Sequence, residues 1–178
     1  LAATTARADD DEARGPHFLA RKGGYAHLFA TALVGGGLRF NNPYRLATPL
    51  GSGAESVSRT ASSLELGLGA TLGDPLGLQH GAAVRAAFAL EGVPQAVLTP
   101  SYVLWRRWTS FAAYARVGVP VVLTPSRTLG IEAAAGGVWF VRGGLGLAGE
   151  LVGDVFWGAG TRERGTPAYP VLGAQLGV

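Results

Sequence analysis

Residues 64–73 read LELGLGATLG, and the side chains change character at every second position. The even positions carry leucine or alanine, whereas the odd positions carry Glu65, Thr71 and glycines. Successive side chains of a β-strand point to opposite faces of the sheet, so this alternation predicts a strand with one apolar face. If water met the other face, that face would be unusually rich in glycine. The stretch therefore raises the question of which solvent meets the leucines.

The same alternation recurs along most of the chain, in segments of about ten residues. The segments with this pattern are 24–40, 64–73, 78–91, 95–105, 109–121, 129–142, 145–157 and 169–178. Together they predict about eight strands in an all-β domain. The alanine-rich stretch 82–89 leaves a helix as an alternative for one segment, although the neighbouring glycines and the period of two argue against it.

Two prolines lie inside the predicted strands. Because proline lacks the amide donor, Pro100 predicts a bulge or shortened pairing within 95–105. Pro120 is predicted to mark the end of the strand that begins near residue 109.

The connections between the predicted strands alternate in length. Tight connections are expected at 74–77 (DPLG), at Arg106-Arg107 and at 142–144 (RGG), a medium one at 91–95, and longer ones at 41–60, 122–128 and 158–168. An even number of antiparallel strands, with short turns at one end and longer loops at the other, is the layout of bacterial outer-membrane barrels.

Composition narrows the alternatives. The chain has 178 residues, of which 48% are hydrophobic, 15% are charged and 28 are glycine. Its formal net charge of +3 is small and scattered, and does not indicate a nucleic-acid partner. There is no cysteine, which excludes disulfides and thiol chemistry, and no run of about 18 apolar residues that would predict a membrane helix.

Two regions are expected along the chain. Residues 1–20 are expected to be a signal-peptide remnant or a disordered tail, because Ala6-Arg7-Ala8 resembles the small-x-small end of a secretory signal. Residues 21–178 are expected to form one barrel domain.

The whole of 24–178 resembles the small eight-stranded outer-membrane barrels of the OmpA-like and OmpX-like group, in strand number, alternation and loop rhythm. This resemblance implies a closed, antiparallel, up-and-down transmembrane barrel in the outer membrane of a Gram-negative bacterium. It also implies membrane lipid, with lipopolysaccharide as a candidate, and the barrel-assembly machinery as partners. One departure is the final QLGV, where barrels of this group commonly end in an aromatic residue. A soluble barrel is the alternative, but its outward face would be polar.

With the leucines facing lipid, the other parity faces the lumen and carries the charges. The predicted lumen residues are Glu65, Arg85, Arg116, Glu132, Glu150 and Asp154. The interior of an eight-stranded barrel is just wide enough for side chains to fill, and buried charges must be paired. We therefore predict an ion-pair network that plugs the lumen. The alternative is a narrow, porin-like path for ions or small solutes.

Aromatic residues are predicted to mark the two membrane interfaces. Phe40, Phe88 and Trp157 fall at the long-loop ends of outward faces, and Tyr102 and Trp139 fall toward the short-turn ends. Ordinary packing of aromatic residues is the alternative. The parity of Trp105 and Trp108 predicts that both point inward, unless a bulge intervenes.

No motif points to an enzyme, and no cofactor or metal site is predicted. Glu150 and Asp154 lie about 13 Å apart along one strand face, which is too far for the usual glycosidase pairs. There is no nucleophile elbow of the G-x-S-x-G type, and the three histidines show no ligand spacing. The sequence predicts a structural or interaction role, with a channel second and an outer-membrane lipid-modifying enzyme third. Arg127 and the RER run at 162–164 are candidate contacts for lipopolysaccharide phosphates.

Overall fold

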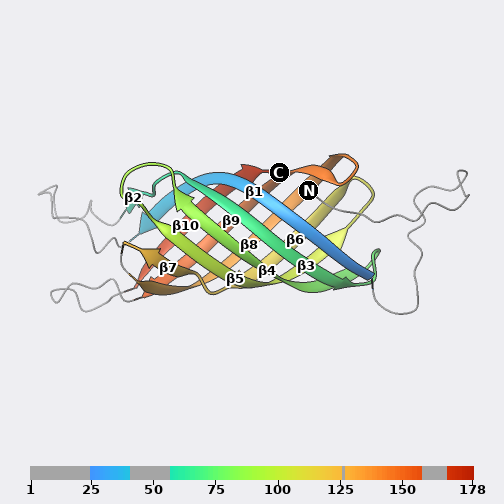
Figure 1. Ribbon diagram of the computed structural model, residues 1–178, viewed down its shortest axis with the longest axis horizontal. Coiled ribbons are helices and arrows are strands. Elements are labelled where there is room, and N and C mark those ends of the chain that lie inside the picture. The colour runs from blue at the N-terminus through green and yellow to red at the C-terminus, as the bar shows by residue number, and fades with distance from the viewer. Residues whose placement is uncertain (1–24, 41–56, 126, 158–167) are drawn as a thin grey trace, which may run out of the picture.

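The computed structural model describes residues 25–40, 57–125, 127–157 and 168–178, which form a closed all-β barrel (Figure 1). The predicted tail at 1–20, most of the 41–60 loop and the arginines of 162–164 lie outside the described residues. Within the described part of the chain, no helix is long and apolar enough to cross a membrane.

Among the described residues, ten strands form one sheet. They are β1 (Tyr25–Phe40), β2 (Val57–Arg59), β3 (Ser63–Gly73), β4 (Leu78–Ala89), β5 (Ala96–Arg107), β6 (Phe111–Gly118), β7 (Val121–Thr124), β8 (Thr128–Arg142), β9 (Leu145–Trp157) and β10 (Tyr169–Gly177). Every pairing is antiparallel, and β10 pairs with β1 to close the ring. β2 pairs only with the end of β1, and β7 continues the wall beyond β6, so the ring has the eight strand positions that the sequence predicts.

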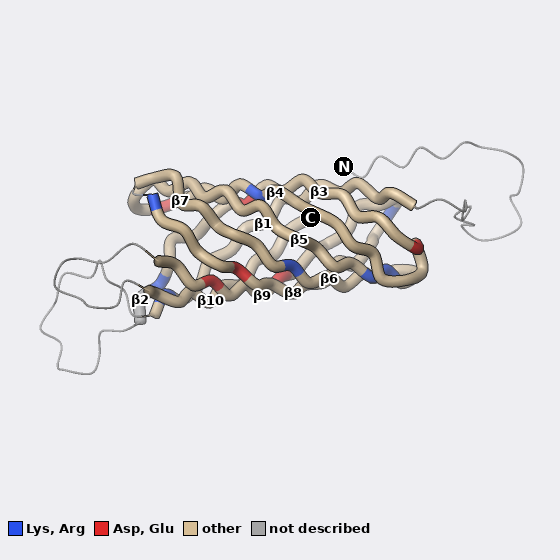
Figure 2. Tube along the Cα trace, turned by 90° about the horizontal axis from the view of Figure 1, so that it is seen from below, with Lys and Arg blue, Asp and Glu red and all other residues tan. Residues whose placement is uncertain are grey.

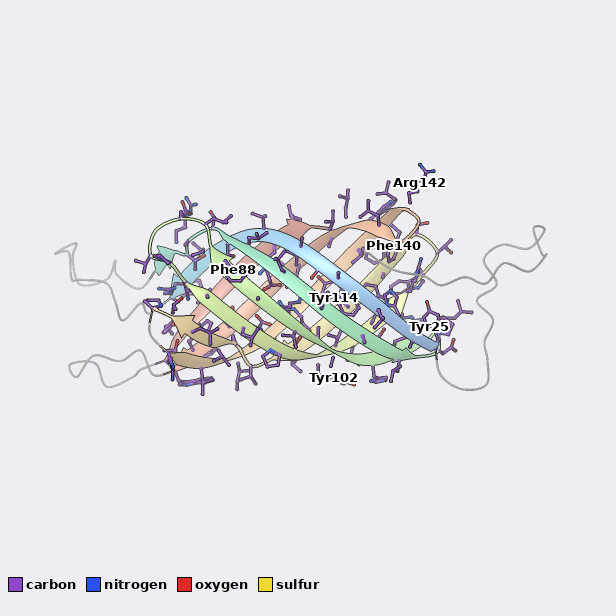
Figure 3. The ribbon with its side chains drawn as sticks, viewed as in Figure 1. Tyr25, Phe88, Tyr102, Tyr114, Phe140 and Arg142 are labelled. Atoms are coloured by element: carbon purple, nitrogen blue, oxygen red, sulfur yellow. The ribbon has the colours of Figure 1, made fainter. Side chains whose placement is uncertain are left out.

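The strand registers place outward residues beside outward residues, and inward residues beside inward residues, all around the ring. Leu68 lies opposite Ala30 of β1 on one side and opposite Val84 of β4 on the other, so apolar side chains lie beside apolar side chains. Because these residues point outward, large apolar side chains remain exposed, and Leu68 keeps 70% of its surface accessible. Figure 3 shows such side chains projecting from the outer surface of the wall.

The glycines of the inward parity lie where the lumen is crowded. A Cβ at Gly67 would come within 2.4 Å of the Thr31 hydroxyl oxygen, and one at Gly136 within 2.7 Å of the Tyr114 ring. Glycine is therefore needed at these two positions because neighbouring side chains occupy the space. Crowding in the lumen therefore explains why glycine alternates with leucine in the 64–73 strand.

Pro100 shortens the pairing on one side only. On the β4 side it stays in register with Val84. On the other side its carbonyl accepts a bond from the Val119 amide at 3.0 Å, so the position without an N–H faces the junction of β6 and β7. Shortened pairing at Pro100 is thus found as predicted.

Pro120 marks the end of the strand that begins at Phe111, as predicted, but the wall continues beyond it. β6 ends at Gly118, but pairing resumes at Val121 as β7. The Pro120 carbonyl accepts a bond from the Gly130 amide at 2.9 Å, which keeps the chain attached to β8 across the break. The expected long loop at 122–128 is therefore mostly strand. In the same way, Arg106-Arg107 belong to β5, and the turn follows them.

Candidate functional site in the lumen

The charged residues of the barrel wall are few (Figure 2). Most of those in the strands are buried or half-buried and point inward. Glu65 lies between the outward residues Leu64 and Leu66 on β3, and Arg85 lies between Val84 and Ala86 on β4. Strand alternation alone therefore places their side chains in the lumen. Both are almost fully buried there.

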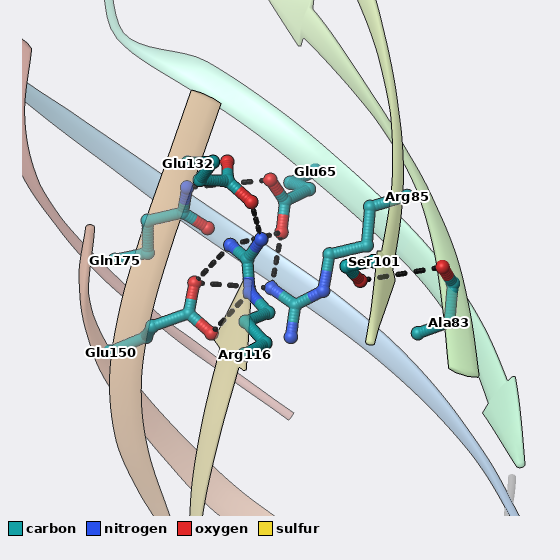
Figure 4. A network of polar contacts seen from close by, with 8 residues as sticks. All are labelled: Glu65, Ala83, Arg85, Ser101, Arg116, Glu132, Glu150 and Gln175. Atoms are coloured by element: carbon teal, nitrogen blue, oxygen red, sulfur yellow. Dashed lines mark hydrogen bonds and ion pairs between the residues drawn. The ribbon is translucent and has the colours of Figure 1, made fainter. Parts of the chain in front are cut away.

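Arg116 of β6 is the centre of the lumen cluster (Figure 4). Its guanidinium binds Glu150 of β9 with two contacts, Nε to Oε2 at 3.1 Å and Nη2 to Oε1 at 2.6 Å. The same guanidinium forms an ion pair with Glu132 of β8 and approaches Glu65 of β3 at 3.9 Å. The planar arrangement of guanidinium donors suits such multiple contacts. Arg116 thus connects its own strand to three others, one of them the neighbouring strand β8.

Arg85 completes the cluster from β4. Its Nη1 lies 2.5 Å from Glu65 Oε1 and 3.1 Å from Glu150 Oε1. The Gln175 amide of β10 donates to Glu65 Oε2 at 3.5 Å. Glu150 therefore forms ion pairs with both arginines, and its side chain has no exposed surface.

Five of the six predicted lumen charges meet in this cluster, and Asp154 does not. Asp154 lies opposite Glu132 in the β8–β9 register. Its Oδ1 is buried without a hydrogen-bond partner among the described residues. Instead, Asp154 lines a cavity of about 140 Å³ on the long-loop side of the cluster, together with Arg39 and Gln175.

The cluster has a clear electrostatic consequence. Two guanidiniums face three carboxylates in a space from which water is largely excluded, and Arg116 and Glu150 have no exposed side-chain surface. Removing charges from water is expensive unless each is paired and hydrogen-bonded. The contacts supply that pairing, so the cluster fills the middle of the lumen with a coupled set of side chains.

A layer of aromatic side chains fills the lumen toward the short turns. Trp105 stacks on Tyr114 and on Phe29, with ring centroids 5.6 Å apart in each pair, and His27 lies 5.4 Å from Trp105. Leu33 is fully buried against this group. Trp105 thus points inward, as its parity predicts, while Phe29 and Leu33 are lumen residues that the sequence analysis did not single out.

Trp108 does not point inward, which corrects that part of the prediction. β5 ends at Arg107, so the strand alternation no longer governs the next residue. Trp108 lies in the turn, 47% exposed, and stacks on Phe111 with ring centroids 5.9 Å apart.

Aromatic rings also line the lumen near the long loops. Phe156 of β9 and Tyr169 of β10 stack with ring centroids 5.3 Å apart, and the Arg39 guanidinium lies 5.2 Å from the centroid of the Tyr169 ring. The lumen therefore consists of a charged middle layer between two layers that contain aromatic rings.

The predicted interface aromatics are mostly on the outer surface. Phe88, Tyr102, Trp139 and Trp157 are exposed, and Phe40 is half-buried at the end of β1. Tyr102 projects from the outside of the wall, whereas Tyr114 lies inside it (Figure 3). The Tyr102 hydroxyl lies 2.5 Å from His80 Nδ1, so this aromatic residue has a polar partner near the short-turn end.

Two described side chains that could exchange a proton already have close partners. Glu150 is held by two arginines, and His80 contacts Tyr102 on the outer wall. The described residues contain no group of three or more histidine or acidic side chains placed to hold a metal ion. The lumen contacts connect side chains from β3, β4, β6, β8, β9 and β10.

No protein-family model and no curated protein sequence matches the chain. Among solved structures, the chain is similar to one described as "De novo design of transmembrane beta-barrels". The two share 11% identical residues with a TM-score of 0.34, over 83% of this chain and 92% of that chain. The assignment of the fold therefore rests on the strand registers and not on this likeness.

Proposed function

We propose that this protein is an integral β-barrel of a bacterial outer membrane with a structural or interaction role. Its lumen is closed by the ion-pair cluster, and its long loops are displayed outside the membrane. The resemblance to the OmpA-like and OmpX-like group supports this proposal.

The observation that carries the proposal is the outer face of the wall. Away from the strand ends, no outward-facing side chain of the described strands is charged. The exposed arginines Arg106 and Arg142 lie beside the short turns. Soluble proteins rarely expose apolar patches larger than a few hundred Å². A closed barrel leaves no unpaired sheet edge where it is complete, which suits a hydrocarbon solvent.

The filled lumen favours a structural role over a channel. Side chains without accessible surface occur in the charged layer and toward the short turns. They are Arg116 in the first region and Leu33, Thr71 and Ala112 in the second. A narrow channel is the second candidate function. Cavities of about 140 Å³ and 440 Å³ lie on either side of the cluster and the aromatic layer, and they could join if both rearranged.

Membrane lipid and the barrel-assembly machinery are the proposed partners. Arg127, exposed in the connection between β7 and β8, is a candidate contact for lipopolysaccharide phosphates. No enzymatic activity is proposed.

Flotation of the refolded protein with phosphatidylcholine vesicles tests the membrane assignment. The wild type should float and resist an alkaline carbonate wash, whereas the pair Leu68→Asp and Leu151→Asp, placed on two exposed outward positions, should reduce insertion. Wild-type protein that stays monodisperse without detergent and does not float would refute the proposal.

Conductance across a planar bilayer separates the plug from the channel. The plugged barrel should give no steady conductance. Steady conductance that disappears when Glu132 or Arg116 is replaced would favour the channel.

A further inference from the structure

The outer wall carries exposed arginines without acidic partners at its short-turn end. Arg106 of β5 and Arg142 of β8 are exposed, and neither forms an ion pair with a described residue. In the described turns at this end, the one acidic residue is Asp74. This part of the described surface therefore has an excess of positive charge.

Arg106 lies against a set of aromatic rings on the outer wall. Its guanidinium carbon is 5.2 Å from the centroid of the Trp108 ring. Trp108 stacks on Phe111, and Phe111 lies directly opposite Trp139 in the β6–β8 register. All three rings are exposed. A guanidinium stacked on a ring face keeps the N–H groups at its edge free to donate, so Arg106 presents donors beside an exposed aromatic surface.

The wall holds these rings in position. A Cβ at Gly137 of β8 would come within 2.6 Å of the Phe111 ring, so the glycine leaves the space that this ring occupies. The Trp108 amide donates to the Phe111 carbonyl at 2.7 Å, which closes the turn between the two residues. Less ordering is required on binding when a site is already held in this way.

The neighbouring arginine does not share this surface. Arg107 is half-buried, and its guanidinium carbon lies 4.3 Å from the centroid of the Phe140 ring. Phe140 packs against the aromatic layer of the lumen. Of the two successive arginines of β5, Arg106 is therefore the one on the outer wall.

We propose that Arg106, Trp108 and Phe111 form a binding site for the headgroup of an acidic phospholipid. The lipid phosphate accepts hydrogen bonds from the edge of the Arg106 guanidinium, and the glycerol and upper acyl chains cover the rings. This inference rests on the membrane-embedded barrel proposed above, and it names a lipid class and the interface at which that lipid binds. Arg127 lies at the long-loop end, so this site is separate from the proposed lipopolysaccharide contact.

Charge and exposed apolar surface together select the occupant. A phosphate group suits the planar donors of a guanidinium. Free inorganic phosphate has nothing with which to cover the rings, whereas a phospholipid does. Phosphatidylcholine carries a cationic group beside its phosphate, which would lie near cations that have no acidic partner. Phosphatidylglycerol has no such group and keeps a net negative charge.

Quenching of tryptophan fluorescence by brominated lipid tests the site, because Trp108 is part of it. The reporter variant combines Trp139→Phe with Trp157→Phe, which leaves Trp108 on the outer wall and Trp105 buried in the lumen. It is refolded into phosphatidylcholine vesicles that contain equal small fractions of brominated phosphatidylcholine or brominated phosphatidylglycerol. Bromine quenches at short range, so the difference between the two lipids reports which one lies beside Trp108.

Phosphatidylglycerol should bind beside Trp108 about fivefold more strongly than phosphatidylcholine, which corresponds to the usual contribution of one arginine near anionic lipid. Arg106→Gln in the same reporter should remove this preference. Arg142→Gln is the matched control, because it removes the same charge from the same end of the barrel. Figure 3 shows Arg142 projecting from the wall. This control should keep most of the preference.

Three results would overturn the lipid site. The first is equal quenching by the two lipids in the reporter. The second is an equal loss of preference in Arg106→Gln and Arg142→Gln, which would indicate attraction to the net charge of this end. The third is loss of the preference in excess inorganic phosphate at constant ionic strength, which would assign the guanidinium to free phosphate.

Flotation of the same samples separates this inference from the proposed function. Protein that does not float refutes the membrane assignment, and the lipid site with it. Floated protein that shows no preference for phosphatidylglycerol refutes the lipid site alone.

Discussion

The inner and outer faces of this barrel are made by the same strands and depend on different physical requirements. Outward positions such as Leu68 and Leu151 contact only what surrounds the barrel, and apolar character is all that they need. Inward positions such as Arg116 and Glu150 contact specific partners from other strands at hydrogen-bond distance. The comparison teaches that the outer face is specified by composition, whereas the inner face is specified by pairing. Substitutions on the two faces should therefore lower the stability of the barrel for different physical reasons.

The largest effect is expected at the centre of the ion-pair cluster. Arg116→Ala leaves Glu132 and Glu150 buried with too little positive charge, and we expect the free energy of unfolding to fall by about 3–5 kcal/mol. Urea titration in detergent micelles measures it. Arg116→Leu combined with Glu150→Leu should recover much of the loss, because both charges of the pair joined by two hydrogen bonds are then removed. A double variant no more stable than Arg116→Ala would contradict the pairing explanation.

On the outer face, the effect should depend on depth in the membrane. Leu68→Arg, in the middle of β3, should destabilise the inserted barrel by about 2–4 kcal/mol. Leu72→Arg, beside the short turn, should cost only about 0–1 kcal/mol. Unfolding of both variants in vesicles gives the comparison. Equal costs at the two depths would mean that water, and not lipid, contacts this face.

A smaller loss is expected when the cluster keeps its centre but loses one partner. Glu132→Ala leaves Arg116 bonded to Glu150 and near Glu65, so a loss of about 1–3 kcal/mol is expected. Unfolding midpoints in detergent measure it. Glu91→Ala, which removes a carboxylate from an exposed ion pair, is the comparison and should cost less. Identical midpoints for the wild type and Glu132→Ala would show that the lumen contacts contribute little to stability.

The smallest effect lies outside the barrel wall. The Ser62 amide and hydroxyl donate to Glu91 at 2.9 Å, and Arg59 lies 2.8 Å away, which lowers the pKa of Glu91. Because its folded pKa is below its unfolded value, the stabilisation is present above the unfolded pKa and is lost as pH falls through the folded pKa. The stability difference between the wild type and Glu91→Gln should therefore shrink on acidification. A difference that stays constant between neutral and acidic pH would rule out this contribution.

The sequence predicts this wall well because strand alternation is a local property. The expected segments match the observed strands within a few residues, and the neighbour pairs Glu65–Arg85 and Arg116–Glu132 follow from strand order alone. The sequence could not predict that Arg85 reaches Glu150, 65 residues away, because a contact across the lumen depends on the stagger between strands. The same limitation explains why Asp154 was expected in the cluster.

Apolar residues on the inward parity were the other difficulty. Phe29 and Leu33 lie on the inward positions of β1, so the alternation that places Trp105 in the lumen could also have placed them there. Only the structure shows that Trp105 provides the surface against which Phe29 stacks. The sequence also did not predict that the wall continues past Pro120 as β7. A proline indicates an interruption of strand pairing, but it does not indicate whether pairing resumes after it.

The position of Arg116 has a consequence for how the barrel is made. Its partners come from β3, β8 and β9, so its charge is not fully neutralised until most of the chain has been added to the sheet. If the barrel spans a membrane as proposed, a wall that lacks β8 and β9 would present an unpaired guanidinium to the bilayer. Such intermediates of assembly would be disfavoured, so these strands would have to join the sheet before or during insertion.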